Sequence, residues 1–232
     1  MVEIKGLEKF AAKDFPGYIA STVFLGGCNF RCPYCHNADL VLRPESLPTL
    51  PLDYFLCYLE SRKNWLEAIC ISGGEPLLET DLEDLIRVVK ERNLLVKVDT
   101  NGSLPARLED FIREGLVDYV AMDVKAPLER YKEVTCSEVK PEDISRTIKL
   151  VRSSGVRHIF RTTVVPGLVE RNDLLKIAQM LEGEDVFQIQ PFVPANTVDR
   201  QFLQVNPFSR EEIEEMAGLV RRYFAEVRVE GA

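Results

Sequence analysis

Residues 68–100 read AICISGGEPLLETDLEDLIRVVKERNLLVKVDT, and this stretch predicts a strand, a helix and a second strand in succession. The runs Ala68–Ser72 and Leu95–Thr100 are short, mostly apolar and rich in β-branched residues, as buried strands of a parallel sheet are. Between them, Thr80–Arg92 carries apolar residues at the spacing of one helix face. The stretch therefore predicts one βα unit followed by the next parallel strand.

The same alternation continues on both sides of this unit. Four further strands are predicted at Ile19–Leu25, Tyr119–Val124, His158–Val165 and Val186–Gln190. Further helices are predicted at Leu52–Lys63, Pro105–Gly115, Pro141–Ser154, Asn172–Leu181 and, from the capping-box pair Ser209 and Glu212, about 209–226. With no repeat, low-complexity segment or linker, residues 1–232 are expected to form one domain. Six such units fit either a doubly wound sheet or a barrel of fewer than eight units, and both bind ligands at the carboxyl ends of the strands.

Composition narrows the class of protein. The 232 residues are 46% hydrophobic and 28% charged, as in a soluble globular chain, and their net charge of -8 opposes binding to nucleic acid. The first residues lack the apolar core of an export signal, and no run approaches the roughly 18 apolar residues of a membrane span. We therefore expect a cytoplasmic protein with neither a nucleic-acid nor a membrane partner.

Three of the six cysteines, Cys28, Cys32 and Cys35, lie close together in the sequence. They belong to the loop 26–37, GGCNFRCPYCHN, directly after the first predicted strand. In a reducing cytosol such a group indicates a metal or redox site before it indicates a disulfide framework. Three thiolates at this spacing suit a [4Fe–4S] cluster in which one iron is left open to bind substrate.

Three other interpretations of this loop stay open on spacing alone. Zinc could be held by the three cysteines and either His36 or His158, although the adjacent Cys35 and His36 reach one ion only with strain. Covalent haem matches residues 32–36 as C-x-x-C-H, but haem attachment usually accompanies export and leaves Cys28 unexplained. Three thiols acting as small apolar core groups would not explain their crowding in a Gly-rich loop.

Polar residues follow the predicted strands at the point where each strand ends. Gly73 and Gly74 allow close approach to the backbone, and Glu75 offers a carboxylate to an ammonium group. Burying such groups without partners costs about 2–7 kcal/mol each, so they need a ligand or one another. Some of them could instead form structural ion pairs, Asp123 with Lys125 and Arg161 with a neighbouring Asp. The strand-end residues after Glu75 are Asp99, Thr100, Asn101, Asp123, Lys125 and Arg161.

Together these motifs resemble those of the radical S-adenosylmethionine (SAM) superfamily. Its cluster motif, C-x-x-x-C-x-aromatic-C, is matched by Cys28, Cys32, Tyr34 and Cys35. Its segment for the methionyl amino group is matched by Gly73-Gly74-Glu75-Pro76. The segments 13–17, 26–37 and 99–102 resemble the activating-enzyme branch, in particular the short activating proteins of anaerobic ribonucleoside-triphosphate reductase, which are related to pyruvate formate-lyase activating enzyme. The resemblance extends over essentially the whole chain and implies an α/β fold, a partial (β/α)6 barrel of the TIM-like type.

The resemblance also implies cofactors, an activity and partners. One [4Fe–4S] cluster on the three cysteines would cleave SAM reductively, and the resulting radical would take hydrogen from a backbone glycine of a glycyl radical enzyme. Flavodoxin or ferredoxin is the expected electron donor. The formate-lyase branch has a histidine shortly after the sixth strand, whereas no histidine follows His158 here. This difference favours anaerobic ribonucleoside-triphosphate reductase as the partner.

Residue roles follow from the resemblance in the same way. Residues matching Asp99, Thr100 and Asp123 help to hold a monovalent cation beside the SAM carboxylate, and those matching Lys125 and Arg161 approach SAM. The other expected SAM-binding residues are Tyr34, Gly73, Gly74, Glu75 and Asn101. We expect His36 to shape the surroundings of the cluster, and Cys57 and Cys70 to be core residues. Gln188 and Gln190, after the sixth strand, have no predicted role.

Two other functions stay open. The chain could be a radical SAM enzyme that acts on a small molecule, as the short enzymes that make 7-carboxy-7-deazaguanine do. It could also be a noncatalytic zinc-binding module. Stimulation of deoxyadenosine formation by a protein or by a metabolite separates the two enzymatic functions, and zinc without iron after anaerobic purification would indicate the module.

Overall fold

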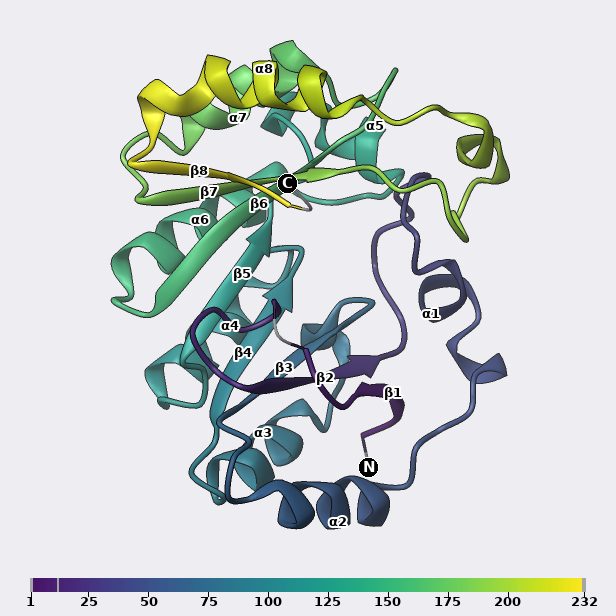
Figure 1. Cartoon of the computed structure of the whole chain (residues 1–232), viewed down its shortest axis with the longest axis vertical. Coiled ribbons are helices and arrows are strands. Elements are labelled where there is room, and N and C mark those ends of the chain that lie inside the picture. Colours follow the sequence, from purple (N-terminus) through teal and green to yellow (C-terminus); the bar gives the residue numbers. More distant parts are fainter. Residues whose placement is uncertain (1, 12, 231–232) are drawn as a thin grey trace.

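In the part of the chain that the structure describes, eight strands form one sheet, in chain order from β1 to β8 (Figure 1). The structure is a computed structural model that describes residues 2–11 and 13–230. β1 runs antiparallel to β2, and the strands from β2 to β8 are parallel to their neighbours. The strands are β1 (Ile4–Glu8), β2 (Ala20–Leu25), β3 (Ala68–Gly73), β4 (Leu95–Thr100), β5 (Tyr119–Asp123), β6 (Arg157–Val164), β7 (Val186–Pro191) and β8 (Glu226–Val229).

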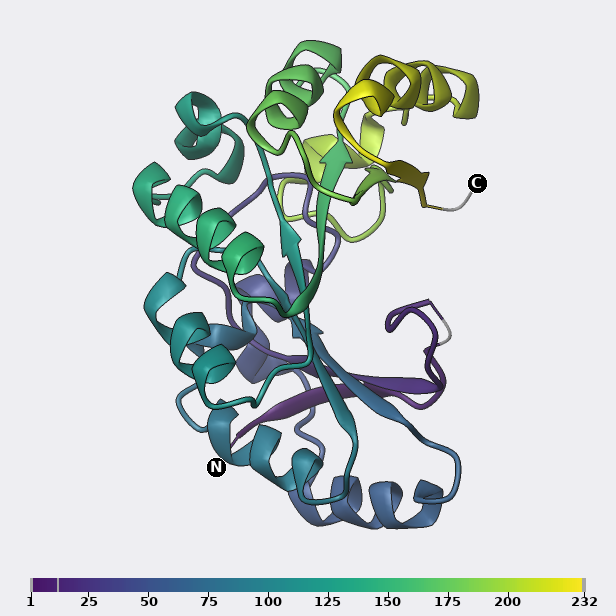
Figure 2. The same ribbon diagram turned by 90° about the vertical axis from the view of Figure 1, so that its left-hand side faces the viewer.

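Helices cover the outer face of the curved sheet, and the inner face is concave and open on one side (Figure 2). None of the helices in the described ranges has both the length and the hydropathy that a membrane crossing requires. The helices are α1 (Ala38–Leu42), α2 (Leu52–Arg62), α3 (Leu82–Lys90), α4 (Pro105–Arg113), α5 (Tyr131–Thr135), α6 (Pro141–Ser153), α7 (Arg171–Met180) and α8 (Arg210–Val220).

The predicted alternation of strands and helices is confirmed. The six predicted strands are β2 to β7, and five predicted helices are α2, α3, α4, α6 and α7; β4 has the predicted bounds, and the others differ from theirs by one or two residues at one or both ends. The parallel sheet curves into a partial barrel, as expected. β1, α1 and α5, of five residues each, were not predicted; β5 is equally short, but four of its five residues are apolar and mark it as a strand.

The C-terminal helix differs from its prediction. Its capping box is confirmed, since the Glu212 N–H donates to Ser209 Oγ at 3.2 Å and the Ser209 N–H donates to Glu212 Oε2 at 2.7 Å. The predicted end near residue 226 is wrong, because α8 ends at Val220 and Glu226–Val229 forms β8 beside β7. Phe224 stacks on Phe187 of β7 with ring centroids 4.8 Å apart, which turns the chain back onto the sheet.

Alternation along each strand separates two faces of the sheet. In β4, Val96 and Val98 are fully buried in the main hydrophobic core, whereas Lys97 and Asp99 point to the concave face. A second, smaller apolar cluster around Phe15 and Tyr119 fills the amino-terminal end of that concave face. The polar groups of the concave face therefore lie toward the carboxyl ends of the strands.

Candidate active site

The three clustered cysteines lie in the loop that leaves the carboxyl end of β2. Cys32 is buried, and Cys28 and Cys35 are partly buried. The Phe30 N–H points to Cys28 Sγ at 3.4 Å, and the Cys35 N–H donates to the Cys32 carbonyl at 3.0 Å. Burial raises the pKa of Cys28 and raises the pKa of Cys32 to about 12. These two thiols therefore stay protonated at neutral pH unless a positive group compensates their charge.

The glycines after β3 pack against the backbone of this cysteine loop. A Cβ on Gly74 would lie 1.8 Å from the Gly27 carbonyl oxygen, and one on Gly73, whose φ is +124°, would lie 2.2 Å from the Leu25 carbonyl oxygen. The Glu75 N–H donates to the Gly27 carbonyl at 2.8 Å. The close approach that the sequence predicted for a ligand is thus made by the chain itself, and it fixes the cysteine loop to the end of β3.

Glu75 is 1% exposed and connects the ends of β3 and β4. Its carboxylate accepts the Asn101 N–H at 2.6 Å, the Thr100 hydroxyl at 2.9 Å and the Leu77 N–H at 3.2 Å. Burial nevertheless raises the pKa of Glu75 to about 7, against the effect of these donors. Three donors leave about one of the four lone-pair directions of the carboxylate for a ligand.

Asp99 and Asp123 belong to a chain of partly buried ion pairs across β4, β5 and β6. Arg161 donates from Nε to Asp123 at 2.7 Å and from Nη1 to Asp99 at 3.3 Å. Lys125 donates to Asp123 at 3.0 Å, and Lys97 pairs with Asp99. Burial opposes ionisation, but Arg161 and the lysines hold the pKa of both aspartates below their usual range. The structural ion pairs considered from the sequence are therefore present.

Lys97 is the member of this network that sequence reasoning missed. Its side chain is 3% exposed, and its Nζ lies 3.5 Å from the Cys70 sulfur. Lys97 and Asp99 are two positions apart, so both side chains project from the same face of β4. Lys97 could have been identified from the sequence, because it interrupts the apolar part of the strand and alternates in step with Asp99.

Asn101 connects the end of β4 to the cysteine loop. Its Nδ2 donates to Asn29 Oδ1 at 2.9 Å and lies 3.8 Å from Cys28 Sγ. Tyr34, in the same loop, has a buried hydroxyl that makes no hydrogen bond within the described residues. Cys32, Lys125 and Asp123 are its electrostatic neighbours. The structure thus brings Tyr34, Glu75, Asn101, Lys125 and the cysteine loop to the same end of the barrel.

Of the two cysteines predicted to lie in the core, one does and one does not. Cys70 is fully buried, as expected, but Cys57 is exposed on α2, so its assignment to the core is wrong. The helical spacing of α2 buries Phe55, Tyr58 and Leu59 and turns residue 57 toward solvent. Gln188 and Gln190 both donate to the Glu230 carboxylate, just beyond β8.

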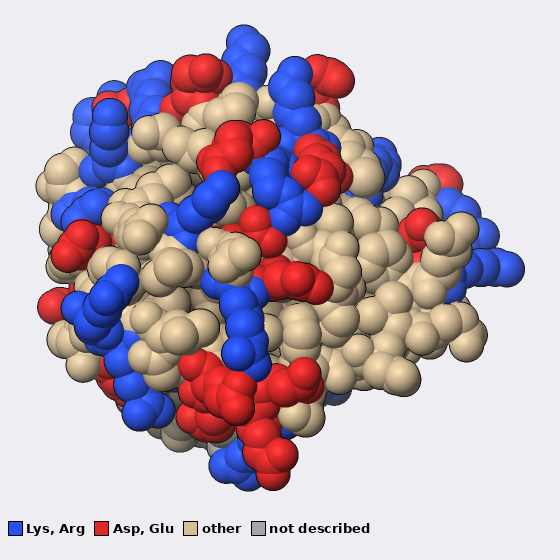
Figure 3. Space-filling view, turned by 90° about the horizontal axis from the view of Figure 1, so that it is seen from above, with Lys and Arg blue, Asp and Glu red and all other residues tan. Residues whose placement is uncertain are grey.

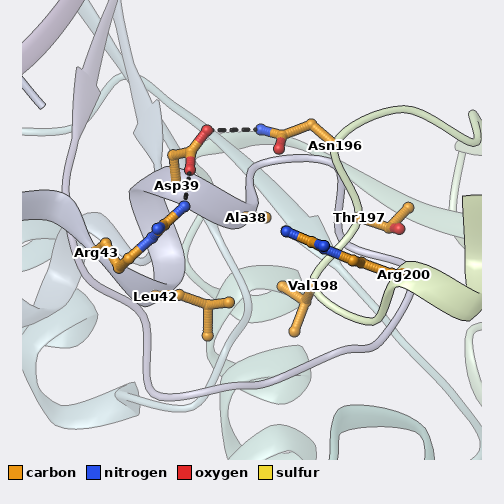
Figure 4. Close-up of a pocket in the computed structure, with 8 residues that line it drawn as sticks. All are labelled: Ala38, Asp39, Leu42, Arg43, Asn196, Thr197, Val198 and Arg200. Atoms are coloured by element: carbon orange, nitrogen blue, oxygen red, sulfur yellow. Dashed lines mark hydrogen bonds and ion pairs between the residues drawn. The ribbon is translucent and has the colours of Figure 1, made fainter. Parts of the chain in front are cut away.

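A pocket of about 240 Å³ lies on the outer side of the cysteine loop, between α1 and the segment 196–200 (Figure 4). Its wall is attached to that loop, since the Val198 N–H donates to the Cys35 carbonyl at 3.1 Å and the Asp199 N–H to the Pro33 carbonyl at 2.9 Å. Asp39 accepts from both Asn196 and Arg43 at 3.1 Å. The segment therefore supports the cysteine loop from outside the barrel.

Comparison with known protein families agrees with this arrangement. The family model of the radical SAM superfamily matches residues 22–181, which include the cysteine loop and the strands from β2 to β6. The chain belongs to the radical SAM superfamily. Membership implies a [4Fe–4S] cluster and SAM as cofactors, and the chain is an enzyme.

The curated relatives place the chain in the activating-enzyme branch of that superfamily. MJ1227 of Methanocaldococcus jannaschii, whose name assigns it to the glycyl-radical enzyme activating enzymes, is 32% identical over 97% of this chain and 94% of its own length. The pyruvate formate-lyase-activating enzymes of Clostridium pasteurianum and Streptococcus mutans are 29% and 30% identical over 79% and 82% of this chain, and over 77% and 76% of their own lengths. The chain is thus a glycyl-radical activating enzyme by family.

Solved structures confirm the fold. SuiB of Streptococcus suis bound to SAM matches 89% of this chain and 48% of its own, with a TM-score of 0.69 and 15% identity. A domain of pyruvate-formate lyase-activating enzyme from Bacteroides vulgatus matches 71% of this chain and 99% of its own, with a TM-score of 0.56 and 17% identity.

Proposed function

We propose that this enzyme generates a glycyl radical on anaerobic ribonucleoside-triphosphate reductase, using a [4Fe–4S] cluster and SAM. The observation that carries the proposal is the attachment of the cysteine loop to the Gly73-Gly74-Glu75 turn, through the Gly27 carbonyl. This contact brings the thiols and the polar strand ends into one site. The residues that we propose to hold the cluster and SAM are far apart in the sequence but are connected by this contact.

The three cysteines suit a cluster by the chemistry of their surroundings. Cys28 Sγ has N–H groups from Phe30 and Asn101 nearby, which are the donors that stabilise a thiolate bound to iron. Burial disfavours free thiolates here, so a positive centre is required to hold them. In the described chain no three His, Cys, Asp or Glu side chains are arranged around a single metal ion. A cluster does not need that arrangement, because each thiolate binds a different iron.

The polar strand ends suit SAM, which carries an ammonium group, a carboxylate and an adenosine. Lys125 and Arg161 supply positive charge for the carboxylate. Glu75 has one lone-pair direction left for the ammonium group. Tyr34, whose electrostatic neighbours are Cys32 and Lys125, is proposed to contact the nucleoside. A monovalent cation beside Asp99 and Asp123 stays part of the proposal, although it would compete with the protein cations that already pair with both aspartates.

The chain's own residues orient the reaction. When bound, the cluster and SAM supply the reductive cleavage of a carbon–sulfur bond and the radical that removes hydrogen from glycine. Asp123 holds Arg161 and Lys125 in position by ion pairs, so neither cation needs to reorganise when an anionic group binds. Glu75 and Asn101 keep the ends of β3 and β4 at fixed distance from the cysteine loop.

The reductase is the proposed partner because no histidine follows His158 in the sequence. Flavodoxin or ferredoxin is the proposed electron donor, and the chemistry fits the reducing cytoplasm. Lys and Arg side chains are interspersed with Asp and Glu side chains over the face seen from above (Figure 3).

The first experiment combines the anaerobically reconstituted enzyme, SAM, a reductant and the reductase from the same organism. We expect a glycyl-radical doublet in electron paramagnetic resonance, about four irons per chain, and deoxyadenosine as a product. Cys32→Ala should abolish all three, whereas Cys57→Ala, on the exposed face of α2, should abolish none. Deoxyadenosine without a glycyl radical would reopen the choice of substrate, and stimulation by a metabolite would favour a small molecule. Zinc in place of iron would refute the radical chemistry.

A further inference from the structure

Gln188 and Gln190, which have no part in the site described above, share one carboxylate at the edge of the sheet. Glu230 Oε2 accepts from Gln190 Nε2 at 2.7 Å and from Gln188 Nε2 at 3.4 Å. Gln188 is in register with Arg161 on β6, and Gln190 with Thr163. Paired residues of parallel strands project from the same face, so the two carboxamides line the concave face beside Arg161.

Unlike Asp99 and Asp123, Glu230 makes no ion pair within residues 2–11 and 13–230. Arg228 lies between Glu226 and Glu230, and it donates from Nε and Nη2 to Glu226 at 2.8 Å each. In residues 2–11 and 13–230, Glu230 makes no ion pair, and its side-chain hydrogen bonds come from the two carboxamides. Its carboxylate can accept further N–H donors, and each carboxamide still has a free N–H.

We propose that Glu230, Gln188 and Gln190 bind the extended, glycine-containing peptide segment of the partner enzyme. The Glu230 carboxylate accepts peptide N–H groups, and the carboxamides pair with the peptide groups beside them. The inference rests on the proposed function and states where the protein substrate lies. It assigns a binding role to residues outside the cysteine loop and the SAM-binding strand ends.

The position of the three residues favours a peptide over a metabolite. Glu230 is exposed, and β8 borders the lateral opening of the barrel (Figure 2). Sites for small molecules are usually enclosed and mostly apolar, whereas an open row of neutral amides and one carboxylate complements a peptide backbone. Because Gln188 is in register with Arg161, a peptide held here lies beside a residue proposed to bind SAM.

The test is Glu230→Gln, which keeps the size of the side chain and removes its charge. We expect the KM for the partner reductase to rise about tenfold, which corresponds to about 1.4 kcal/mol, while kcat at saturating partner changes less than about twofold. The measurement is the glycyl-radical doublet as a function of partner concentration. Glu211→Gln removes the same charge from an exposed position on α8 and should leave KM unchanged. Equal circular dichroism and iron content establish that both variants are folded.

The outcomes separate this inference from the proposed function. If the wild-type enzyme forms deoxyadenosine and activates the partner, but Glu230→Gln keeps its KM, the inference alone is overturned. If a metabolite rather than any glycyl radical enzyme stimulates the wild type, the peptide assignment is wrong. If the wild type forms no deoxyadenosine with reductant and SAM, the proposed function fails and the inference fails with it.

Discussion

Buried and partly buried carboxylates at the mouth of the barrel form two regions, and their pKa values are shifted in opposite directions. Asp99 and Asp123, on β4 and β5, have guanidinium and ammonium partners, and their pKa lies below the usual range despite burial. Glu75, after β3, receives three neutral N–H and O–H donors, and burial raises its pKa to about 7. The contrast teaches that a paired cation, more than the number of hydrogen bonds, compensates the desolvation of a carboxylate here.

Removing the charge of Asp123 should disrupt the ion pairs of the first region and lower the stability of the protein. Asp123→Asn leaves the partly buried Arg161 and Lys125 with one carboxylate fewer, so we expect the free energy of unfolding to fall by about 3 kcal/mol, the lower end of the range for buried pairs. Urea unfolding of the cluster-free protein under anaerobic conditions measures it. Glu226→Gln, which breaks an exposed pair with Arg228, is the control and should change stability little. Similar effects of the two substitutions would mean that the buried network contributes no more than a surface pair.

The raised pKa of Glu75, in the second region, should be visible in the pH dependence of stability. Because the folded-state pKa of Glu75 is raised, from 4.5 to about 7, its contribution to stability is present below about pH 4.5 and is lost as the pH rises through about 7. The stability of the wild type relative to Glu75→Gln should therefore fall by about 3 kcal/mol between about pH 4.5 and pH 8. Urea unfolding of both proteins across this range measures the difference. A difference that does not vary with pH would mean that the three donors keep Glu75 ionised throughout.

The sequence predicted the parallel strands and their polar ends because both follow from short-range patterns. The cysteine spacing and the residues Glu75, Asp99, Asp123 and Arg161 stand out from their neighbours in any reading of the chain. The partners of those residues were harder to predict, because the ion pairs join residues up to 62 positions apart in the sequence. The contact between Gly74 and the Gly27 carbonyl could not be predicted from the sequence either. A glycine that makes room for a ligand and a glycine that makes room for another backbone segment look identical in a sequence.

The C-terminal part of the chain was predicted least well, for a local reason. Apolar residues from Ile213 to Val220 have helical spacing, and Phe224 fits the same period. Its actual partner is Phe187 on β7, a contact that no periodicity reveals. Missing β8 also hid Glu230, so the group formed with Gln188 and Gln190 could be found only from the structure.

The smallest effect concerns the two cysteines that the sequence placed together in the core. Cys70 lies beside Lys97 and Asp99, and burial, then Asp99, raises the pKa of its thiol, so it stays neutral within the charged region. Cys70→Ser should lower the free energy of unfolding by about 1–2 kcal/mol, and Cys57→Ser should change it by less than about 0.5 kcal/mol. Iodoacetamide labelling of the native protein, read by peptide mapping, should modify Cys57 and spare Cys70. Labelling of Cys70 before unfolding would show that solvent reaches the ion-pair network, and the contrast with Glu75 would then need a cause other than burial.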